Sequence, residues 1–556
     1  MADENPPVDH ETGVPRNPDV KERGDLRFPV VGLGASAGGL VALKKFLEQM
    51  PKKTGMAYVV ILHLSPKHES VADKVLQGST RMPVIQVKEP TPLQPDHVYV
   101  ISPNQDLQMS DGHLRVTEAK RPRGHHVAID LFFRTLADTH QDKAVGIVLS
   151  GTGADGAVGI ARIKEQGGVT FVQSPEDAEY DDMPRAAIAS AQVDFVLPVA
   201  DIPDKLIEWW KNAREIELPQ PVDANAPILQ TPPDESEAAE RALREILEIL
   251  AARSGHDFRY YKRATVLRRI ERRMQVNVQQ NLPAYRSFLK DRPEEARALL
   301  DDMLIGVTNF FRDRDAFDTL ERLVLPEIMH GGRRDEPVRV WVPGCATGEE
   351  AYSIAMLLAD QAHTLSTPPG FQVFASDIDE AAIAFGRAGV YPESIVTDVP
   401  PTRLRQFFGK EQHHYRINKP IRDRVLFALH NVLRDPPFSR IDLISCRNLL
   451  IYLDREVQTR LLDMFHFALR PGGYLFLGSS ESTDGASTHY EVVDKRTTAS
   501  TARALRRAAC GRPVRCCPCS RRDRRRRRNP CTSISAAVFP SPTCISACWS
   551  ITRRLR

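Results

Sequence analysis

Three residues that together make an activated nucleophile are spread over the first third of the chain. Ser36 follows the apolar run FPVVGLGA and precedes Gly38 and Gly39, His63 ends YVVILH, and Asp155 lies in the loop GTGADGA after AVGIVLS. All three fall where a strand of an open α/β sheet would end, and such sheets place their sites there. A serine needs a base to take its proton, so the pattern predicts a nucleophile, a general base and an orienting acid.

Spacing alone leaves other interpretations of this segment open. GLGASAGG is also typical of a dinucleotide phosphate loop, and it is compatible with a plain tight turn. The phosphate-loop fold has an acidic residue after its second strand to hold the ribose, whereas this chain has His63 there. Position does not separate His63 from His68, His125 and His126.

A second group of polar residues follows consecutive strand-like segments in the other half of the chain. Gly344 and Glu349 lie in the loop of VRVWVPGCATGEEAYSIAM, Asp377 follows FQVFAS, Asn431 follows VLFALH and Asn448 follows LISC. Taken singly, an Asp or Asn at a strand end is more often a turn former or a helix cap. Their recurrence after four consecutive strands favours one shared ligand site.

An arginine row stands on the predicted helix TVLRRIERRM. Helical spacing places Arg268 beside Arg272 and Arg269 beside Arg273, because residues four apart share a helix face. A solvated helix face and a patch for acidic partners are both compatible with this pattern.

The elements that position these residues can be predicted from hydrophobic patterning. Strand-like runs alternate with helix-like patterns at 38–50, 129–139, 156–166 and 201–213, which predicts a doubly wound α/β domain with a parallel sheet and helices on both faces. A mainly helical part and a second α/β part follow a Pro-containing linker. We expect a disordered N-terminus at 1–26, an α/β domain at 27–212, a linker at 213–236, a small helical domain at 237–330, a second α/β domain at 331–495 and a tail at 496–556.

Composition bounds the class of protein. The 556 residues are 42% hydrophobic and 26% charged, which is typical of soluble globular domains. No apolar run of about 18 residues occurs, so we expect no membrane insertion. The N-terminus lacks a secretory pattern, and only Cys345 and Cys446 precede residue 500, which favours a reducing cytoplasmic location.

The net charge of +3 hides an uneven distribution. The tail at 496–556 holds sixteen Arg and one acid, so the rest of the chain is negatively charged. An acidic body argues against nucleic acid as a partner. The tail also holds seven Cys, whose spacing matches no regular zinc pattern, and no metal site is expected.

The segments around the serine resemble one family. GLGASAGGL, ILHLSP, VYVISPN, VLSGTGADGAVGI, VQSPEDAEYDDMPRAAI and VDFVLPV, over about residues 27–212, resemble the catalytic domain of CheB, the chemotaxis protein-glutamate methylesterase. The resemblance implies hydrolysis of a glutamate γ-methyl ester on a chemoreceptor, with Ser36, His63 and Asp155 as the triad. Thr152 stands where the family usually has Met. The receiver domain that usually precedes this domain is missing, so phosphorylation control by that route is not expected.

The later segments resemble a second family. RRIERRM, VTNFFRD, WVPGCATGEEAYSIAM, ASDIDEAAIAFGRAGVY, HNVLRDPP, IDLISCRNLLIYLD and GGYLFLGSSES, over about residues 237–485, resemble CheR, the chemotaxis receptor methyltransferase. The resemblance implies a small helical domain, a Rossmann-like methyltransferase domain, S-adenosylmethionine as cofactor and a basic helix that docks acidic receptor helices. Gly306 departs from the Asn that we expect in this family. The implied cofactor contacts are Thr308, Arg312, Gly344, Glu349 (or Glu350), Asp377, Asn431 and Asn448, with Tyr452 near the reacting carboxylate.

The resemblance ends near VVDK, before the Arg- and Cys-rich tail. An out-of-frame reading of a GC-rich gene would explain the change in composition, and a basic arm is the alternative. In the first case we expect the second sheet to lack its final strand.

Together these patterns predict a fusion that removes and adds methyl groups on glutamates of methyl-accepting chemoreceptors or related signalling proteins. The alternatives are a chain with methylesterase activity alone, a non-catalytic receptor-docking scaffold, and a nicotinamide oxidoreductase. The last lacks hydride-transfer signatures.

Overall fold

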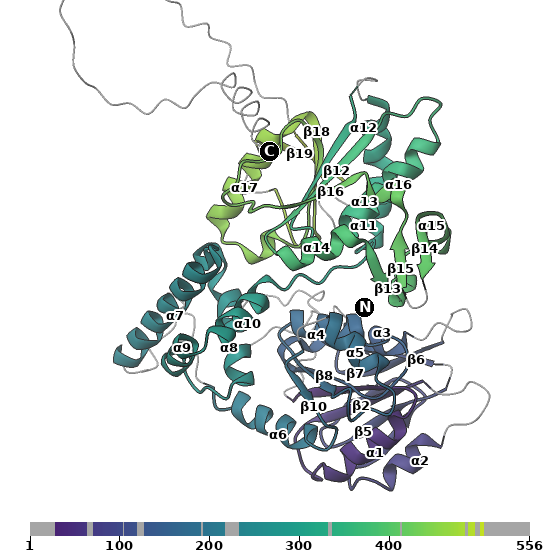
Figure 1. The fold of residues 1–556 in the computed structure, drawn as a ribbon, viewed down its shortest axis with the longest axis vertical. Coiled ribbons are helices and arrows are strands. Elements are labelled where there is room, and N and C mark those ends of the chain that lie inside the picture. The colour runs from purple at the N-terminus through teal and green to yellow at the C-terminus, as the bar shows by residue number, and fades with distance from the viewer. Residues whose placement is uncertain are drawn as a thin grey trace, which may run out of the picture. The chain divides into compact units, whose positions relative to one another are not determined.

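The computed structural model describes residues 28–63, 71–103, 105–118, 127–190, 193–216, 233–331, 336–411, 414–483, 488–494 and 501–504. Figure 1 traces these elements along the chain. The expected N-terminal disorder at 1–26, most of the expected linker and the tail beyond residue 504 lie outside the described residues, as do His68, His125 and His126.

The first domain is built on a seven-stranded sheet with every strand parallel to its neighbours, in the order β10-β9-β8-β1-β2-β5-β3. Its central strands are buried along their whole length, as expected for Val- and Ile-rich strands covered on both faces. The predicted doubly wound sheet is confirmed. The strands are β1 (Val30–Ala35), β2 (Ala57–Leu62), β3 (Val84–Val87), β5 (Val98–Ile101), β8 (Ala144–Val148), β9 (Val169–Gln173) and β10 (Phe195–Leu197).

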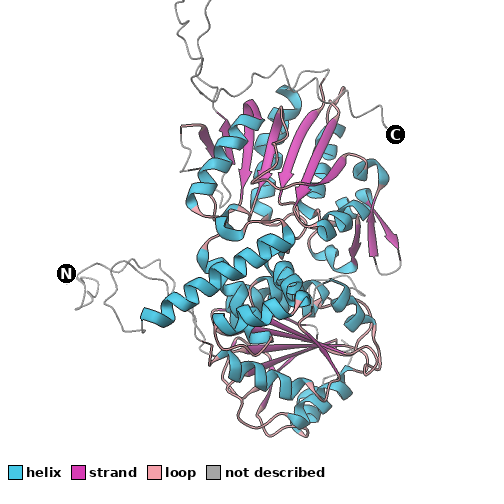
Figure 2. Cartoon of the chain, turned by 60° about the vertical axis from the view of Figure 1, so that its left-hand side comes forward, coloured by secondary structure: helices cyan, strands magenta, loops and turns pink. Residues whose placement is uncertain are grey.

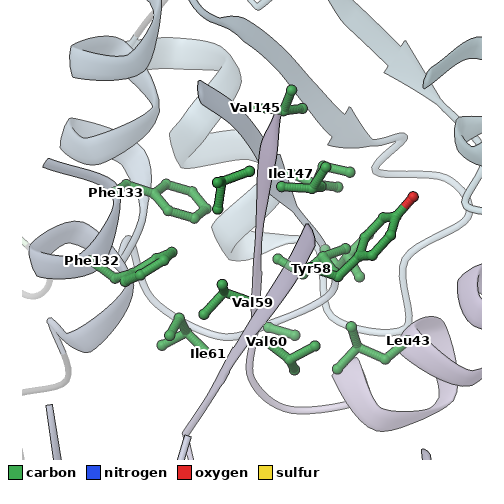
Figure 3. Packing of buried hydrophobic residues seen from close by; sticks show 14 of the residues in the cluster. Leu43, Tyr58, Val59, Val60, Ile61, Phe132, Phe133, Val145 and Ile147 are labelled. Atoms are coloured by element: carbon green, nitrogen blue, oxygen red, sulfur yellow. The ribbon is translucent and has the colours of Figure 1, made fainter. Parts of the chain in front are cut away.

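Helices cover both faces of this sheet (Figure 2). Phe132 and Phe133 lie on one side of the strands, and Tyr58 and Leu43 lie on the other (Figure 3). The packing is close, because a Cβ at Gly32 would lie 2.7 Å from the Phe133 ring. The helices are α1 (Gly39–Gln49), α2 (Ala72–Gln77), α3 (Ala128–His140), α4 (Ala157–Glu165), α5 (Asp182–Ser190) and α6 (Ile202–Ala213), with a 3-10 turn, η1, at Gln141–Lys143.

A small antiparallel sheet, which the sequence analysis did not foresee, is inserted before α3. It has the order β4-β7-β6, with β4 (Thr91–Pro92), β6 (Gln105–Ser110) and β7 (His113–Glu118). Asp111, with a φ of 47°, and Gly112, with a φ of 75°, make its two-residue turn, the conformation that short hairpins favour.

A helical domain follows, and all of its described elements are helices, as predicted. Its core joins Ile246 and Leu250 of α7 to Ile270 of α8 and Leu289 of α9. The Asn281 side chain accepts the Ala284 N–H and so begins α9, a common N-cap. The helices are α7 (Pro233–Ser254), α8 (Arg263–Val276), α9 (Leu282–Asp291) and α10 (Pro293–Leu304), with a 3-10 turn, η2, at Phe258–Tyr260.

The last domain is a Rossmann-like α/β unit, as predicted. Its seven-stranded sheet has the order β16-β12-β11-β17-β18-β20-β19, parallel except where β20 pairs with β18 and β19. The strands are β11 (Val338–Pro343), β12 (Phe371–Asp377), β16 (Val425–Leu429), β17 (Ile441–Cys446), β18 (Leu469–Leu477), β19 (Tyr490–Asp494) and β20 (Thr501–Ala504).

Strand β20 corrects two expectations about the tail. The predicted domain end at residue 495 is too early, and the expected loss of the final strand does not occur. β20 lies between β18 and β19, and Ala502 is fully buried. A strand forms here despite the changed composition because the ladder bonds join backbone groups.

Helices flank this second sheet, and a three-stranded antiparallel sheet is inserted after α14. The inserted sheet has the order β13-β15-β14, with β13 (Val390–Pro392), β14 (Phe408–Glu411) and β15 (His414–Ile417). The helices are α11 (Arg314–Thr319), α12 (Leu325–Gly331), α13 (Glu349–His363), α14 (Glu380–Ala388), α15 (Pro401–Phe407), α16 (Lys419–Arg422) and α17 (Arg455–Ala468), with single turns η3 (Leu320–Val324), η4 (Glu393–Thr397) and η5 (Leu450–Tyr452).

Candidate active sites

The structure brings Ser36, His63 and Asp155 together at the carboxyl ends of three adjacent strands. His63 Nδ1 lies 3.0 Å from Ser36 Oγ, and its Nε2 lies 2.8 Å from Asp155 Oδ2. A carboxylate can only accept, so Nε2 carries the proton and Nδ1 is left to accept the serine proton. The imidazole and the carboxylate are 9% and 2% exposed, so this chain of hydrogen bonds is largely shielded from water.

Small residues let the chain turn sharply at the serine. Ser36 lies between β1 and α1, and its N–H donates to the Ser150 carbonyl at 3.0 Å. Gly38 begins the helix with a φ of 70°, which glycine adopts at little cost. A Cβ at Gly38 would lie 2.8 Å from both the Ser150 hydroxyl and the Glu179 carboxylate. The turn therefore depends on glycine for both conformation and space.

The backbone of α3 fixes the carboxylate of the triad. Asp155 Oδ2 accepts the Ile129 N–H at 3.0 Å, and Oδ1 accepts the Asp130 N–H at 2.9 Å. These donors belong to the first turn of α3, where N–H groups have no partner within the helix. These two hydrogen bonds were not predicted from the sequence. Thr152, which replaces the usual Met of the resembling family, is exposed in the same loop.

The second candidate site is the loop between β11 and α13. Gly344 and Gly348 have φ values of 68° and 95°, and a Cβ at Gly348 would lie 2.8 Å from the Phe427 ring. Asp377 holds this loop, because its carboxylate accepts the Ala346 N–H at 2.8 Å. Burial raises the pKa of Asp377. Gly344 is exposed, so the backbone there is open to a ligand, whereas Gly348 is buried against Phe427.

A cavity of about 60 Å³ opens beside this loop. Five of the predicted residues line it, namely Thr308, Arg312, Gly344, Asn448 and Tyr452. The predicted Glu349, Asp377 and Asn431 do not line it. Asn431 makes a turn instead, since its side chain accepts the Leu433 N–H at 2.9 Å. A turn former is the other role that an Asn at a strand end commonly has.

The structure distinguishes the two glutamates of the loop. Glu350 lines the cavity and accepts the Ser445 hydroxyl at 2.6 Å, whereas Glu349 accepts the Thr347 hydroxyl. Burial raises the pKa of Glu349 to about 7. Burial also raises the pKa of Glu350, although the positive charge of Arg447 reduces this rise. Glu350 is therefore better placed than Glu349 to meet an ammonium group.

Arg447 and Glu481 also contribute to this candidate site, although no role was predicted for them from the sequence. Arg447 lines the cavity, its side chain is fully buried, and its Nε has no hydrogen-bond partner among the described residues. Glu481 accepts N–H groups from Asn448 at 3.0 Å and Leu450 at 2.7 Å, and so holds the loop after β17. An unpaired donor, a carboxylate and open glycine backbone fit the polar methionine end of S-adenosylmethionine.

The predicted docking arginines are largely buried. Arg269, Arg272 and Arg273 are 3%, 1% and 8% exposed, and only Arg268 of the four is partly exposed. Arg273 pairs with Glu295, and Arg272 pairs with Asp194 and Asp302. The row is therefore neither a solvated face nor an open patch for acidic partners, because acidic groups of two neighbouring elements cover most of it.

Among the described residues, no helix is long and apolar enough to cross a bilayer. No group of three or more metal-ligating side chains gathers in the same part of the chain.

Three family models match separate stretches of the chain. They are CheB methylesterase at 31–206, the all-alpha domain of CheR methyltransferase at 241–304, and the SAM binding domain of CheR methyltransferase at 306–499. The first match contains the serine site, and the third contains the glycine loop and most of the residues that line the cavity.

Individual proteins are also similar to parts of this chain. An uncharacterized 104.1 kDa protein of Rhodobacter capsulatus is 38% identical over 76% of this chain, which spans 45% of that relative's length. The chemotaxis protein methyltransferase of Escherichia coli is 34% identical over 43% of this chain and 83% of its own length. The solved CheB methylesterase catalytic domain of Thermotoga maritima is 24% identical, with a TM-score of 0.31, over 33% of this chain and 99% of its own.

Proposed function

The chain belongs to the CheR methyltransferase family and carries a CheB methylesterase domain ahead of it, and from this we propose a bifunctional enzyme that hydrolyses glutamate methyl esters and methylates glutamates. The observation that carries the first activity is the hydrogen-bonded chain of Ser36, His63 and Asp155. S-adenosylmethionine is the cofactor of the second activity. The proposed substrates are methyl-accepting chemoreceptors or related signalling proteins in the cytoplasm.

The first domain performs ester hydrolysis in two steps. His63 Nδ1 takes the proton of Ser36 as the serine Oγ attacks the ester carbonyl, and the imidazolium then protonates the methoxide group, which leaves as methanol. A water molecule, deprotonated by the same nitrogen, attacks the acyl-enzyme, and the imidazolium returns the proton to Ser36 Oγ as the glutamate carboxylate is released. Asp155 keeps Nε2 protonated throughout and stabilises the charged ring.

The second domain mainly positions its reactants. S-adenosylmethionine supplies an activated methyl group when it is bound. Gly344 allows close approach of the backbone, and Glu350 and Arg447 offer opposite charges to the ammonium and carboxylate ends. Tyr452 borders the place of the incoming glutamate. Transfer then requires only that the carboxylate oxygen be held in line with the methyl group.

Replacing the nucleophile separates the two activities. Ser36→Ala should reduce methanol release from a methylated receptor fragment to background, while methyl transfer and S-adenosylhomocysteine binding stay at the parent level. Ser110→Ala, on the hairpin strand β6, is the matched control and should leave both activities unchanged. Methanol release retained by Ser36→Ala would rule out this serine as the nucleophile.

A further inference from the structure

A glutamate of the methylesterase domain lines the cavity of the methyltransferase domain. Glu165 is the last residue of α4, and it borders the same cavity as Thr308, Arg312 and Tyr452. Its side chain is 4% exposed and pairs with Arg162 of its own helix. Burial is the main cause that raises the pKa of Tyr452, and the negative charge of Glu165 raises this pKa further. A carboxylate of the type that this domain methylates therefore already faces the cofactor loop.

Buried polar contacts hold α4 in this place. Arg272 of α8 pairs with Asp194, which precedes β10, at 2.5 Å, and its Nε donates to the Gly168 carbonyl at 3.0 Å. Lys164 lies 3.3 Å from Asp302 of α10. Although burial alone would raise the pKa of Asp194, Arg272 and Lys164 hold it below the usual value. The methylesterase domain thus covers the arginine face of α8 with complementary charge.

A second contact joins the two enzymes away from α8. Arg134 of α3 donates to both carboxylate oxygens of Asp398, at 3.0 and 3.2 Å. Asp398 lies just before α15 of the methyltransferase domain. A two-pronged arginine–carboxylate pair fixes orientation as well as distance. Together with the contacts of α8 and α10, this pair favours one docked arrangement.

We propose that Glu165 is a built-in pseudosubstrate, so that the docked methylesterase domain keeps the methyltransferase site closed to acidic substrates. The proposal rests on the proposed methyltransferase activity and adds its regulation. The cavity of about 60 Å³ is small beside the several hundred Å³ of ordinary ligand pockets, so it cannot hold the cofactor together with a substrate side chain while Glu165 is in place. Methylation then requires the domain to move away, and an acidic substrate competes with Glu165 for the site.

Steady-state kinetics of the full chain test this idea. Glu165→Ala should lower the KM for a synthetic Glu-rich helical peptide by about tenfold, the factor expected if the closed form dominates by about ten to one. The turnover number and methanol release should stay near the parent values. Glu208→Ala, on α6, is the matched control, because the Glu208 side chain is half exposed and pairs with Lys205 of its own helix. An unchanged KM for Glu165→Ala would overturn the proposal.

Amide hydrogen exchange gives a readout that needs no catalysis. In the parent chain, saturating Glu-rich peptide should increase exchange across α4, and Arg134→Ala should increase it without peptide. Exchange that stays unchanged in both cases would overturn the docking. If exchange responds but no variant transfers methyl groups, the docking stands and the proposed activity fails. A mass gain of one methyl group on Glu165 after incubation with S-adenosylmethionine would also overturn the proposal, because Glu165 would then be a substrate.

Discussion

Replacing Asp155 by Asn tests whether the carboxylate selects the histidine tautomer. Asp155 accepts three donors in the structure, from His63 Nε2, the Ile129 N–H and the Asp130 N–H. An asparagine has one accepting oxygen and one donating nitrogen. If the nitrogen faces His63, the imidazole must accept at Nε2, which moves its proton to Nδ1 and towards Ser36.

Each of these two consequences has an expected magnitude. A histidine with its proton on Nδ1 cannot take the serine proton, and a tautomer error of this kind costs about 10⁴-fold in turnover. In the same orientation the buried Ile129 N–H meets another donor, which lowers the free energy of unfolding by about 1–3 kcal/mol. The opposite amide orientation would leave the Asp130 N–H facing a donor, so neither orientation avoids the penalty.

Methanol release and thermal unfolding of Asp155→Asn measure the two effects. S-adenosylhomocysteine binding should be unchanged, which shows that the second half is intact. Asp204→Asn, an exposed position on α6, is the matched control. A turnover within tenfold of the parent value, in a folded Asp155→Asn chain, would refute the role given to the carboxylate.

Three further predictions concern the methyltransferase half. Gly348→Ala should abolish S-adenosylhomocysteine binding but not methanol release, because its Cβ would lie 2.8 Å from Phe427 and its φ is 95°; calorimetric binding at the parent level would contradict this. Burial raises the pKa of Glu349 from 4.5 to about 7, so the folded state binds more protons between these values and stability falls by about 3 kcal/mol as pH rises through them. Glu349→Gln should flatten that profile in urea unfolding, and a parallel profile would count against it. Glu481→Gln should weaken cofactor binding by roughly 10–100-fold, since an amide cannot accept all the N–H groups that Glu481 holds; unchanged affinity would show that the loop needs no such support.

The strands and the triad could be predicted because their signals are local. Each central strand is a short apolar run bounded by Gly or polar residues; Ser36 and His63 follow such runs directly, and Asp155 lies in the loop after one. A parallel sheet brings the ends of its strands to one edge, so sequence order suggested this grouping, and the family resemblance was needed to single out His63. The hydrogen bonds that Asp155 accepts from α3 form only when that helix packs beside the loop of Asp155. Nothing in the sequence near either segment indicates that packing.

The arginine row shows why the rest could not be predicted. Helical spacing reports which side chains share a face, but not what covers that face. The acids that bury Arg272 come from Asp194, far earlier in the chain, and from Asp302 on another helix. Similarly, Asp377 and Asn431 were placed correctly at strand ends, yet their oxygens bind nearby backbone. Local patterns identify strand ends reliably and do not identify which oxygens remain available to a ligand.

Strand β20 also sets a limit on how far the chain can be shortened. It is an inner strand, since β19 is joined to the sheet through it. Cutting the chain before Thr501 would therefore remove two strands from the sheet and expose the paired edge of β18. That edge would carry the aromatic side chains of Tyr474 and Phe476, which are buried in the intact domain. An unpaired edge of this kind is a template for self-association, so removal of the arginine-rich segment must begin after Ala504 if the protein is to stay monodisperse.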